Sequence, residues 1–408
     1  MKKIFGALTT VILCISMVSL FGFAVTAQNS DSWPMFHYDL THTGYSNTKA
    51  PSSNQTLWTF TANSEVWSSP TLANGIVYVG SFDHNVYALN ATTGVKIWKF
   101  STGGEIFSSP AIINGIVYIG SSDHQIYGLN ASNGALIWNY TTGNEVQCSP
   151  TVSGGVVYIG SSDGNLYALN AVNGIGVWNF TTGGDIISAP ALSNGVLYFG
   201  SYDKKVYALN SSTGSQKWSY KTGGVTESSP VVANGMVFIG SDKTYALNAE
   251  SGASVWNFTG TGYNVCVQAS PAYANGLVYT GGAIDNNVYA LNATTGALVW
   301  NYTTGGGIFS APAIISSTLY VSSYDNKTYA LDATTGNFSW SYQTNGNIYA
   351  SPAIVNGVLY ICSFDHNIYA IGQLDSGSNI PVIIYYLITA VILVIIVIVA
   401  VLMLKKRQ

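Results

Sequence analysis

The chain has 408 residues, of which 48% are hydrophobic, 13% aromatic and only 8% charged, whereas about 25% are charged in typical soluble domains. This apolar and aromatic content can bury a large core, which excludes a disordered chain. The formal net charge is −4 and the single arginine is Arg407, so a protein that binds phosphate backbones is excluded and no nucleic-acid partner is expected.

Residues 1–27 have the features of a secretory signal peptide. Lys2 and Lys3 precede a long apolar run, which ends in Val-Thr-Ala at residues 25–27. A basic start, an apolar centre and small residues before the cleavage point are typical of such signals. An uncleaved membrane anchor is the alternative. Residues 28–55 follow as a lead-in segment.

A unit of about 40 residues is repeated eight times along residues 56–372. Each unit carries Ser-Pro or Ala-Pro, and the prolines stand at positions 70, 110, 150, 190, 230, 271, 312 and 352. In the unit at 105–140 we expect strands at 106–113, 116–121, 125–129 and 135–140, separated by turn signals such as Asn114-Gly115. Four short strands in each repeat of this length predict a propeller blade. The expected fold is all-β, an eight-bladed β-propeller of four-stranded antiparallel blades.

The eighth repeat is incomplete. It begins at Pro352 and stops after Ile371, without the tryptophan-bearing fourth strand. A spare strand of that type precedes the first repeat, around Trp58. We therefore expect residues 56–61 to complete the last blade and close the ring, which also removes an open sheet edge.

The C-terminal region predicts a single membrane span. After a linker at 373–380, the segment 381–404 contains 23 apolar residues without a charge, from Val382 to Leu404. This is about 34 Å of helix, enough to cross a bilayer core. The basic tail at 405–408 is expected in the cytoplasm by the positive-inside rule. The sequence thus predicts a single-pass protein of the cell membrane with an extracellular propeller.

An eleven-residue motif such as Ala88–Trp98 occurs seven times, and Trp33-Pro-Met-Phe36 stands near the start. The motif resembles the tryptophan-docking motif of the PQQ-repeat propellers, a superfamily that includes quinoprotein alcohol dehydrogenases and the outer-membrane assembly factor BamB. The resemblance implies an eight-bladed propeller in which tryptophans fill the gaps between blades. A fold shared by enzymes and binding proteins says little about function.

Dehydrogenases of this superfamily hold the quinone PQQ and Ca²⁺ in the propeller mouth, and many carry a disulfide between adjacent cysteines. This chain has no adjacent cysteines; Cys148, Cys266 and Cys362 are far apart and are expected to be small buried side chains. We assign no catalytic residue, no metal site and no cofactor. PQQ with calcium remains the low-probability alternative.

The sequence therefore favours a cell-surface, membrane-anchored PQQ-repeat-like propeller that is not an enzyme and acts as a binding or scaffolding module for protein or glycan partners. A quinoprotein, PQQ-dependent oxidoreductase is one alternative and a purely structural envelope protein is another. The sequence does not indicate an oligomeric state.

Two sets of residues are distributed unevenly around the ring and suggest a ligand site in the mouth. The aromatic residues that stand three positions before the prolines are Trp67, Phe107, Phe309 and Tyr349, all in blades 7, 8, 1 and 2. The turns between second and third strands carry His84, His124 and His366 in blades 8, 1 and 2. Duplication of neighbouring blades is the simpler explanation of both sets. His37 and His42 are expected at the surface or as capping residues.

Two further features suit an exported domain. The stretch between Trp256 and Pro271 is irregular and, with Tyr263 and Cys266, is a second candidate for ligand specificity. Sequons make several asparagines candidates for glycosylation. These are Asn54, Asn139, Asn179, Asn257, Asn301, Asn326 and Asn337.

Overall fold

The computed structural model describes residues 32–260 and 269–373, which belong to one compact unit. The predicted signal peptide, the membrane span, the basic tail and nearly all of the linker lie outside the described residues. So does the irregular stretch with Tyr263 and Cys266. Across residues 32–260 and 269–373, no helix has the length and apolar character needed to cross a membrane.

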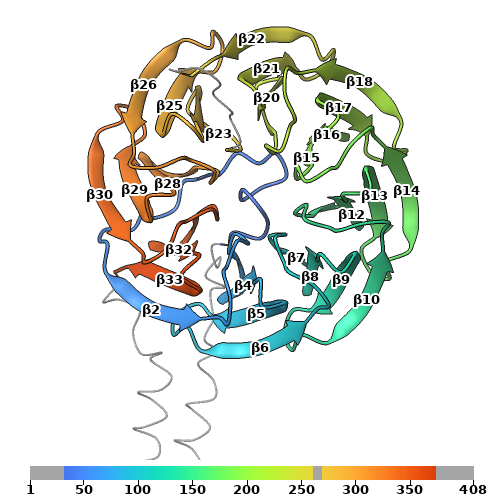
Figure 1. Ribbon diagram of the computed structural model, residues 1–408, viewed down its shortest axis with the longest axis horizontal. Coiled ribbons are helices and arrows are strands. Elements are labelled where there is room, and N and C mark those ends of the chain that lie inside the picture. The colour runs from blue at the N-terminus through green and yellow to red at the C-terminus, as the bar shows by residue number, and fades with distance from the viewer. Residues whose placement is uncertain (1–31, 261–268, 374–408) are drawn as a thin grey trace, which may run out of the picture. The chain divides into compact units, whose positions relative to one another are not determined.

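Eight sheets are arranged around a central axis, which confirms the eight-bladed propeller (Figure 1). Within each blade the strands run from the axis outwards in chain order. The strands of blades 1 to 4 are β3 (Thr71–Ala73), β4 (Ile76–Gly80), β5 (Asn85–Asn90), β6 (Lys96–Ser101), β7 (Ala111–Ile113), β8 (Ile116–Gly120), β9 (Gln125–Asn130), β10 (Leu136–Thr141), β11 (Thr151–Ser153), β12 (Val156–Gly160), β13 (Asn165–Asn170), β14 (Gly176–Thr181), β15 (Ala191–Ser193), β16 (Val196–Ser201), β17 (Lys205–Asn210) and β18 (Gln216–Lys221).

Blades 5 to 8 follow the same plan, and two strands from the N-terminal segment join blades 7 and 8. The strands are β19 (Val231–Ala233), β20 (Met236–Gly240), β21 (Thr244–Asn248), β22 (Ser254–Phe258), β23 (Ala272–Ala274), β24 (Leu277–Gly281), β25 (Asn287–Asn292), β26 (Leu298–Thr303), β27 (Ala313–Ile315), β28 (Thr318–Ser322), β29 (Lys327–Asp332), β30 (Phe338–Gln343), β31 (Ala353–Val355), β32 (Val358–Cys362) and β33 (Asn367–Gly372), with β1 (Tyr45–Ser46) and β2 (Thr56–Thr61).

The first strand of each blade is shorter than the sequence predicts. In blade 2 it is β7, at 111–113, and not the expected 106–113. Pro110 cannot donate to a sheet ladder, and the N–H of Ser109 before it donates to Ser149 Oγ of the next blade at 2.9 Å. The residues before the proline therefore link blades together and do not extend the strand.

The tryptophans dock each blade onto its neighbour, as the motif predicts. Trp58 Nε1 donates to the carbonyl of Ala91 at 2.8 Å, and its ring covers Gly94. Gly94 has a φ of 70°, and a Cβ there would lie 2.6 Å from the Trp58 ring, so only glycine fits. The same indole-to-carbonyl bond is made by Trp98, Trp138, Trp178, Trp218, Trp256 and Trp300.

The turn between the second and third strands is fixed by an aspartate in every blade. Asp83 accepts the hydroxyl of Tyr87 at 2.6 Å and the backbone N–H of Asn63, in the loop before the first strand, at 2.9 Å. These turns and loops form one end of the ring, the upper face. The remaining turns form the lower face, where Ala91 N donates to Gly75 O at 2.9 Å. The other aspartates that accept a tyrosine hydroxyl in this way are Asp123, Asp163, Asp203, Asp242, Asp285, Asp325 and Asp365.

The ring is closed by the N-terminal strand. β2 pairs antiparallel with β33, so that Thr61 faces Asn367 and Thr56 faces Ile371. This is the strand that the incomplete eighth repeat lacks. Near the axis, Ser351 N donates to Ser69 Oγ at 2.9 Å, which joins blade 8 to blade 1.

The lead-in segment runs through the centre of the ring (Figure 1) and covers the inner edges of most blades. Its carbonyls accept six backbone N–H groups of innermost strands, at 2.6–3.0 Å. In blade 7 it adds the parallel strand β1 beside β27, so this sheet has five strands and not four. The six donors are Leu72, Ile112, Leu192, Val232, Tyr273 and Ile314, and their acceptors are Trp33, Pro34, Leu40, Thr41, Thr43 and Gly44.

The prediction that His37 and His42 lie at the surface is wrong, because they are only 2% and 1% exposed. His37 Nδ1 lies 2.8 Å from His42 O and Nε2 lies 3.0 Å from Pro312 O, and a neutral ring donates to one of these two carbonyls. His42 Nδ1 lies 3.2 Å from Pro230 O. Burial lowers the pKa of His37 to about 4 and that of His42 to about 3. Both histidines are therefore neutral at neutral pH and tie the lead-in segment to distant blades.

Protonation of the unfolded chain should make the ring less stable in mild acid. The histidines have a pKa of about 6.5 when unfolded, so as the pH falls below that value the unfolded state takes up protons that the folded state cannot. Between pH 6 and pH 5 each histidine should lower the free energy of unfolding by about 1 kcal/mol per pH unit. The free energy of unfolding, measured by urea denaturation, should fall less steeply with decreasing pH in His42→Asn than in the wild type. The asparagine amide can still donate to Pro230 O. Equal slopes for both proteins would contradict this account.

Candidate functional site

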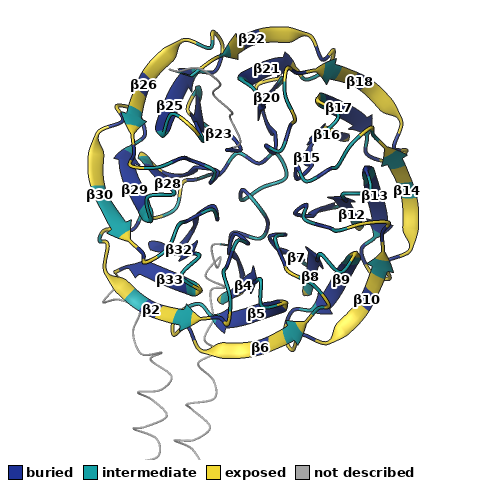
Figure 2. Cartoon of the chain, viewed as in Figure 1, coloured by how far each residue is buried: buried dark blue, intermediate teal, exposed yellow. Residues whose placement is uncertain are grey.

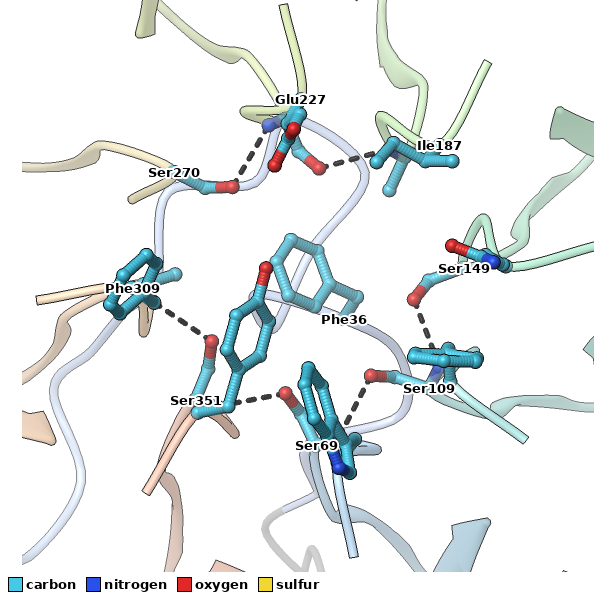
Figure 3. A pocket seen from close by; sticks show the side chains of 16 residues that line it. Phe36, Ser69, Ser109, Ser149, Ile187, Glu227, Ser270, Phe309 and Ser351 are labelled. Atoms are coloured by element: carbon cyan, nitrogen blue, oxygen red, sulfur yellow. Dashed lines mark hydrogen bonds between the residues drawn. The ribbon is translucent and has the colours of Figure 1, made fainter. Parts of the chain in front are cut away.

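A cavity of about 130 Å³ lies on the axis (Figure 3). It is surrounded by the described side chains three positions before the prolines, which point toward the axis because they occupy the same place in successive blades. Those that line it are Trp67, Phe107, Gln147, Ile187, Glu227, Phe309 and Tyr349. The structure thus brings together all four aromatic residues that the sequence suggests.

A ring of serines also lines this cavity. The serine before each proline accepts the N–H of the equivalent residue in the preceding blade, as Ser109 Oγ does from Ser69 N at 3.0 Å. Ala189 and Ala311 interrupt the ring, because alanine has no acceptor. The serines that take part are Ser69, Ser109, Ser149, Ser229, Ser270 and Ser351.

The cavity is a cup with a floor. Phe36 of the lead-in segment lines its lower end (Figure 3). The Phe36 ring lies 5.2 Å from the ring of His37 and 5.7 Å from that of His42. Because these histidines are anchored on distant blades, the floor is held in place by the same contacts that stabilise the ring. The open end faces the upper-face loops.

One wall of the cup belongs to a continuous cluster of aromatic rings, here called the aromatic arc, of which Trp67, Phe107, Phe309 and Tyr349 line the cavity. Trp67 is its centre, with Phe364 at 4.4 Å and Phe82 at 5.0 Å, both stacked, and with Phe107 and Tyr349 at its edges. All its members are partly buried. The arc consists of Trp67, Phe82, Phe107, Phe309, Tyr324, Tyr349 and Phe364.

Three members of the arc, Phe82, Tyr324 and Phe364, were not predicted from the sequence. Each stands directly before the repeated aspartate of the turn between the second and third strands. Blades 2 and 3 have serine at this position. The same comparison of repeats that found Trp67 would have found them, had it included this column.

The opposite wall is polar or aliphatic, with Gln147, Ile187 and Glu227. Glu227 accepts the hydroxyl of Tyr202 at 2.6 Å. Burial and the nearby Glu227 carboxylate raise the pKa of Tyr202 and of Tyr349. Both phenols are therefore protonated at neutral pH and can donate hydrogen bonds.

Acidic residues surround the mouth of the cup in blades 1 to 4. Glu65 accepts Trp67 Nε1 at 2.7 Å, and Glu145 accepts Gln147 Nε2 at 2.7 Å. Glu105 is exposed and Asp185 half-buried at the equivalent positions. The mouth therefore presents negative charge beside the aromatic arc.

The three turn histidines do not reach the cup. His84, His124 and His366 are exposed, do not line the cavity and have φ values of 65°, 68° and 73°. Other blades place Gly164 or Asn326 here, also with positive φ. Histidine is among the residues that tolerate this left-handed conformation. The conformation of the turn therefore explains why histidine occurs at these positions.

The remaining predicted features are separated from the cup. Cys148 and Cys362 are buried, as expected, and burial raises the pKa of the Cys148 thiol to about 12. Among the described residues, no group of three His, Cys, Asp or Glu side chains is placed to hold a metal ion.

Most of the candidate glycosylation sites follow a docking tryptophan on an outermost strand. These are Asn139, Asn179, Asn257 and Asn301. Asn54 is in the lead-in segment, Asn326 in an upper-face turn and Asn337 in a lower-face turn.

Solved structures with the same architecture include proteins of different kinds. BamB from Moraxella catarrhalis superposes with a TM-score of 0.69 at 17% identity, covering 78% of this chain and 100% of that one. Quinohemoprotein alcohol dehydrogenase from Comamonas testosteroni has a TM-score of 0.72 at 15% identity, covering 86% and 82%. The computationally designed Ika8 protein has a TM-score of 0.70 at 14% identity, covering 78% and 100%. Likeness at such low identity shows the fold alone.

Sequence comparison gives the family. No curated protein matches the sequence significantly. The PQQ-repeat family described as outer membrane protein assembly factor BamB matches residues 48–109, 83–188, 181–307 and 243–371. These matches span most of the propeller, and the chain therefore belongs to this BamB-like PQQ-repeat family.

Proposed function

We propose that the chain is a membrane-anchored, non-catalytic binding module whose cup receives an apolar side chain of a protein partner. The observation that carries the proposal is the aromatic arc of blades 7, 8, 1 and 2, in which four rings line an open cup and three more pack against them. Partly exposed aromatic clusters of this kind are typical of partner-binding surfaces.

The size of the cup supports an anchor residue more than an enclosed ligand. Its volume is about 130 Å³, whereas pockets that bury drug-sized molecules have about 300–1,000 Å³. A single side chain inserted from a protein surface fits this space, and such central anchors contribute most of the affinity of many interfaces.

The charge at the mouth suggests the chemistry around that anchor. Glu65, Glu105, Glu145 and Asp185 lie on four successive blades. A partner with lysine or arginine beside its apolar anchor would complement them and be attracted on approach. Among the described residues that line the cup there is no lysine or arginine.

A glycan is the second candidate, because partly exposed aromatic rings also bind sugars. Trp67 is less suited to this role than its sequence position suggests, since Phe82 stacks at 5.0 Å and Phe364 at 4.4 Å against its ring. Little of either ring face remains for a sugar to cover. A protein side chain can instead contact ring edges, which favours the protein partner.

The quinone cofactor of the dehydrogenase relatives fits this cup poorly. Its three carboxylates need cationic partners, but the part of the lining that the structure describes offers Glu227 and neither lysine nor arginine. Burial against a carboxylate without cations is unfavourable for such an anion. We therefore favour binding over quinone-dependent oxidation, and over a purely structural role, for which an open aromatic cup is not needed.

Blocking the cup should abolish partner binding without unfolding the ring. In Ile187→Trp the larger ring should fill the cup from the wall opposite the aromatic arc. Ile284→Trp is the matched control, because Ile284 is 59% exposed on the upper face away from the cup. With the full chain in detergent, we expect Ile187→Trp to lower affinity for captured protein partners at least tenfold, while the control binds like the wild type.

Melting temperatures of both variants should stay near that of the wild type. Equal binding by the two variants would place the site elsewhere. Retention of glycans on an array by the wild type, lost in Ile187→Trp, would favour the second candidate.

The proposed membrane anchor is tested by the orientation of the chain across the membrane. If 381–404 spans the cell membrane, the propeller is outside and residues 405–408 are inside. Protease added to intact cells should then remove the propeller and spare an epitope tag placed after Gln408. Digestion of the tag in intact cells would contradict this orientation, and a control with permeabilised cells shows that the tag is cleavable.

A further inference from the structure

Exposed large apolar side chains are concentrated at the lower end of the ring, in turns and on the adjoining rim. Eleven of the thirteen in the described residues lie in lower-face turns or at the start of outermost strands; Val225 and Ile284 belong to the upper face. The outermost strands are the exposed rim of the ring in Figure 2. Val172, at 69% exposed, and Val95, at 63%, are more exposed than either upper-face residue.

The apolar side chains form an arc over blades 1 to 3, here called the lower arc. It contains seven of the eleven residues, from Val95 to Val177. Blade 4 has Ser215-Gln216-Lys217 at the same positions, which ends the arc. The six members that carry the argument are Val95, Ile97, Leu136, Ile137, Ile175 and Val177.

The charges near the lower arc are positive. Lys96 and Lys99 are exposed between and beside its members. No acidic residue occurs in the corresponding segments 91–101, 131–141 and 171–181. Apolar side chains interspersed with lysine, without acidic residues, suit an anionic lipid surface.

The acidic residues lie mainly at the opposite end of the ring. Among the described acidic residues only Asp39, Glu250 and Asp332 are outside the upper-face turns and loops. A negatively charged bilayer surface would repel the upper face and not the lower arc. The two ends of the ring therefore differ in both charge and apolarity.

The chain also leaves the ring at the lower face. β33 starts at an upper-face turn and ends at Gly372, whose N–H donates to Gln55 O at 2.8 Å. Blade 8, which contains β33, is the neighbour of blade 1. Eight residues separate Gln373 from Val382, where the predicted span begins. They can cover at most about 29 Å, which keeps this face near the bilayer.

We propose that the lower arc rests on the lipid headgroup region of the membrane, so that the cup opens away from it. The proposal rests on the membrane anchor of the proposed function and adds an orientation and a second binding surface. Burial of the apolar side chains in the interface supplies the attraction, and Lys96 and Lys99 pair with anionic headgroups. The cup then faces the space from which a partner arrives.

Lipid quenching of a fluorescent label tests this orientation. The full chain, with Cys14 and Cys266 replaced by serine, is reconstituted into vesicles of phosphatidylcholine and phosphatidylglycerol at three to one. Cys148 and Cys362 are 0% exposed, so a label on Val177→Cys or, as the matched control, on Ile284→Cys is selective. Headgroup spin-labelled lipid should quench the label at 177 at least twofold more than the label at 284.

Two further measurements separate the possible failures. The double change Ile97→Glu and Ile137→Glu should reduce quenching at 177 to the level at 284 with an unchanged melting temperature; unchanged quenching contradicts the proposal. A chain that floats with vesicles but shows equal quenching at both sites contradicts only the contact between the lower arc and the lipid. Equal quenching is also the result expected if this face binds a protein. A chain that does not float contradicts the membrane anchor and this proposal together.

Discussion

The structure depends on one constraint: eight blades must close into a ring, and the N-terminal segment closes it in two places. At the periphery β2 supplies the missing strand beside β33. At the axis the lead-in segment accepts six backbone N–H groups of innermost strands. A buried N–H without a partner costs about 1–3 kcal/mol. The segment therefore stabilises blades that are far apart in the sequence, and the buried His37 and His42 fix its course.

The same segment determines where a binding site can form. By crossing the axis it places Phe36 in the lining of the central cavity, beside the residues of the upper-face loops. The aromatic arc and the acidic mouth then lie on that face, while the lower arc and the chain exit lie on the other. The proposed partner binding and the proposed membrane contact thus lie at opposite ends of the ring.

The repeated features were predictable from the sequence, because each depends on residues that are close together in the chain. The strands, the docking of Trp58 onto Gly94 and the closing strand all follow from comparing one repeat with the next. The burial of His42 was not predictable in this way, since its partner Pro230 is 188 residues distant. Trp67, Phe107, Phe309 and Tyr349 were predictable because they share one position of the repeat. Phe364 stands at another position of the repeat, and its stacking on Trp67 brings together the two ends of the ring.

Hydrogen exchange at the innermost strands tests most directly whether the lead-in segment holds the ring together. The N–H groups of Leu72, Ile112, Leu192, Val232, Tyr273 and Ile314 donate to this segment, while no backbone bond from Val152 or Ile354 to it is seen among the described residues. We predict that the six exchange only with global unfolding and that the other two exchange faster. Equal rates in all eight blades would contradict the central role of the lead-in segment.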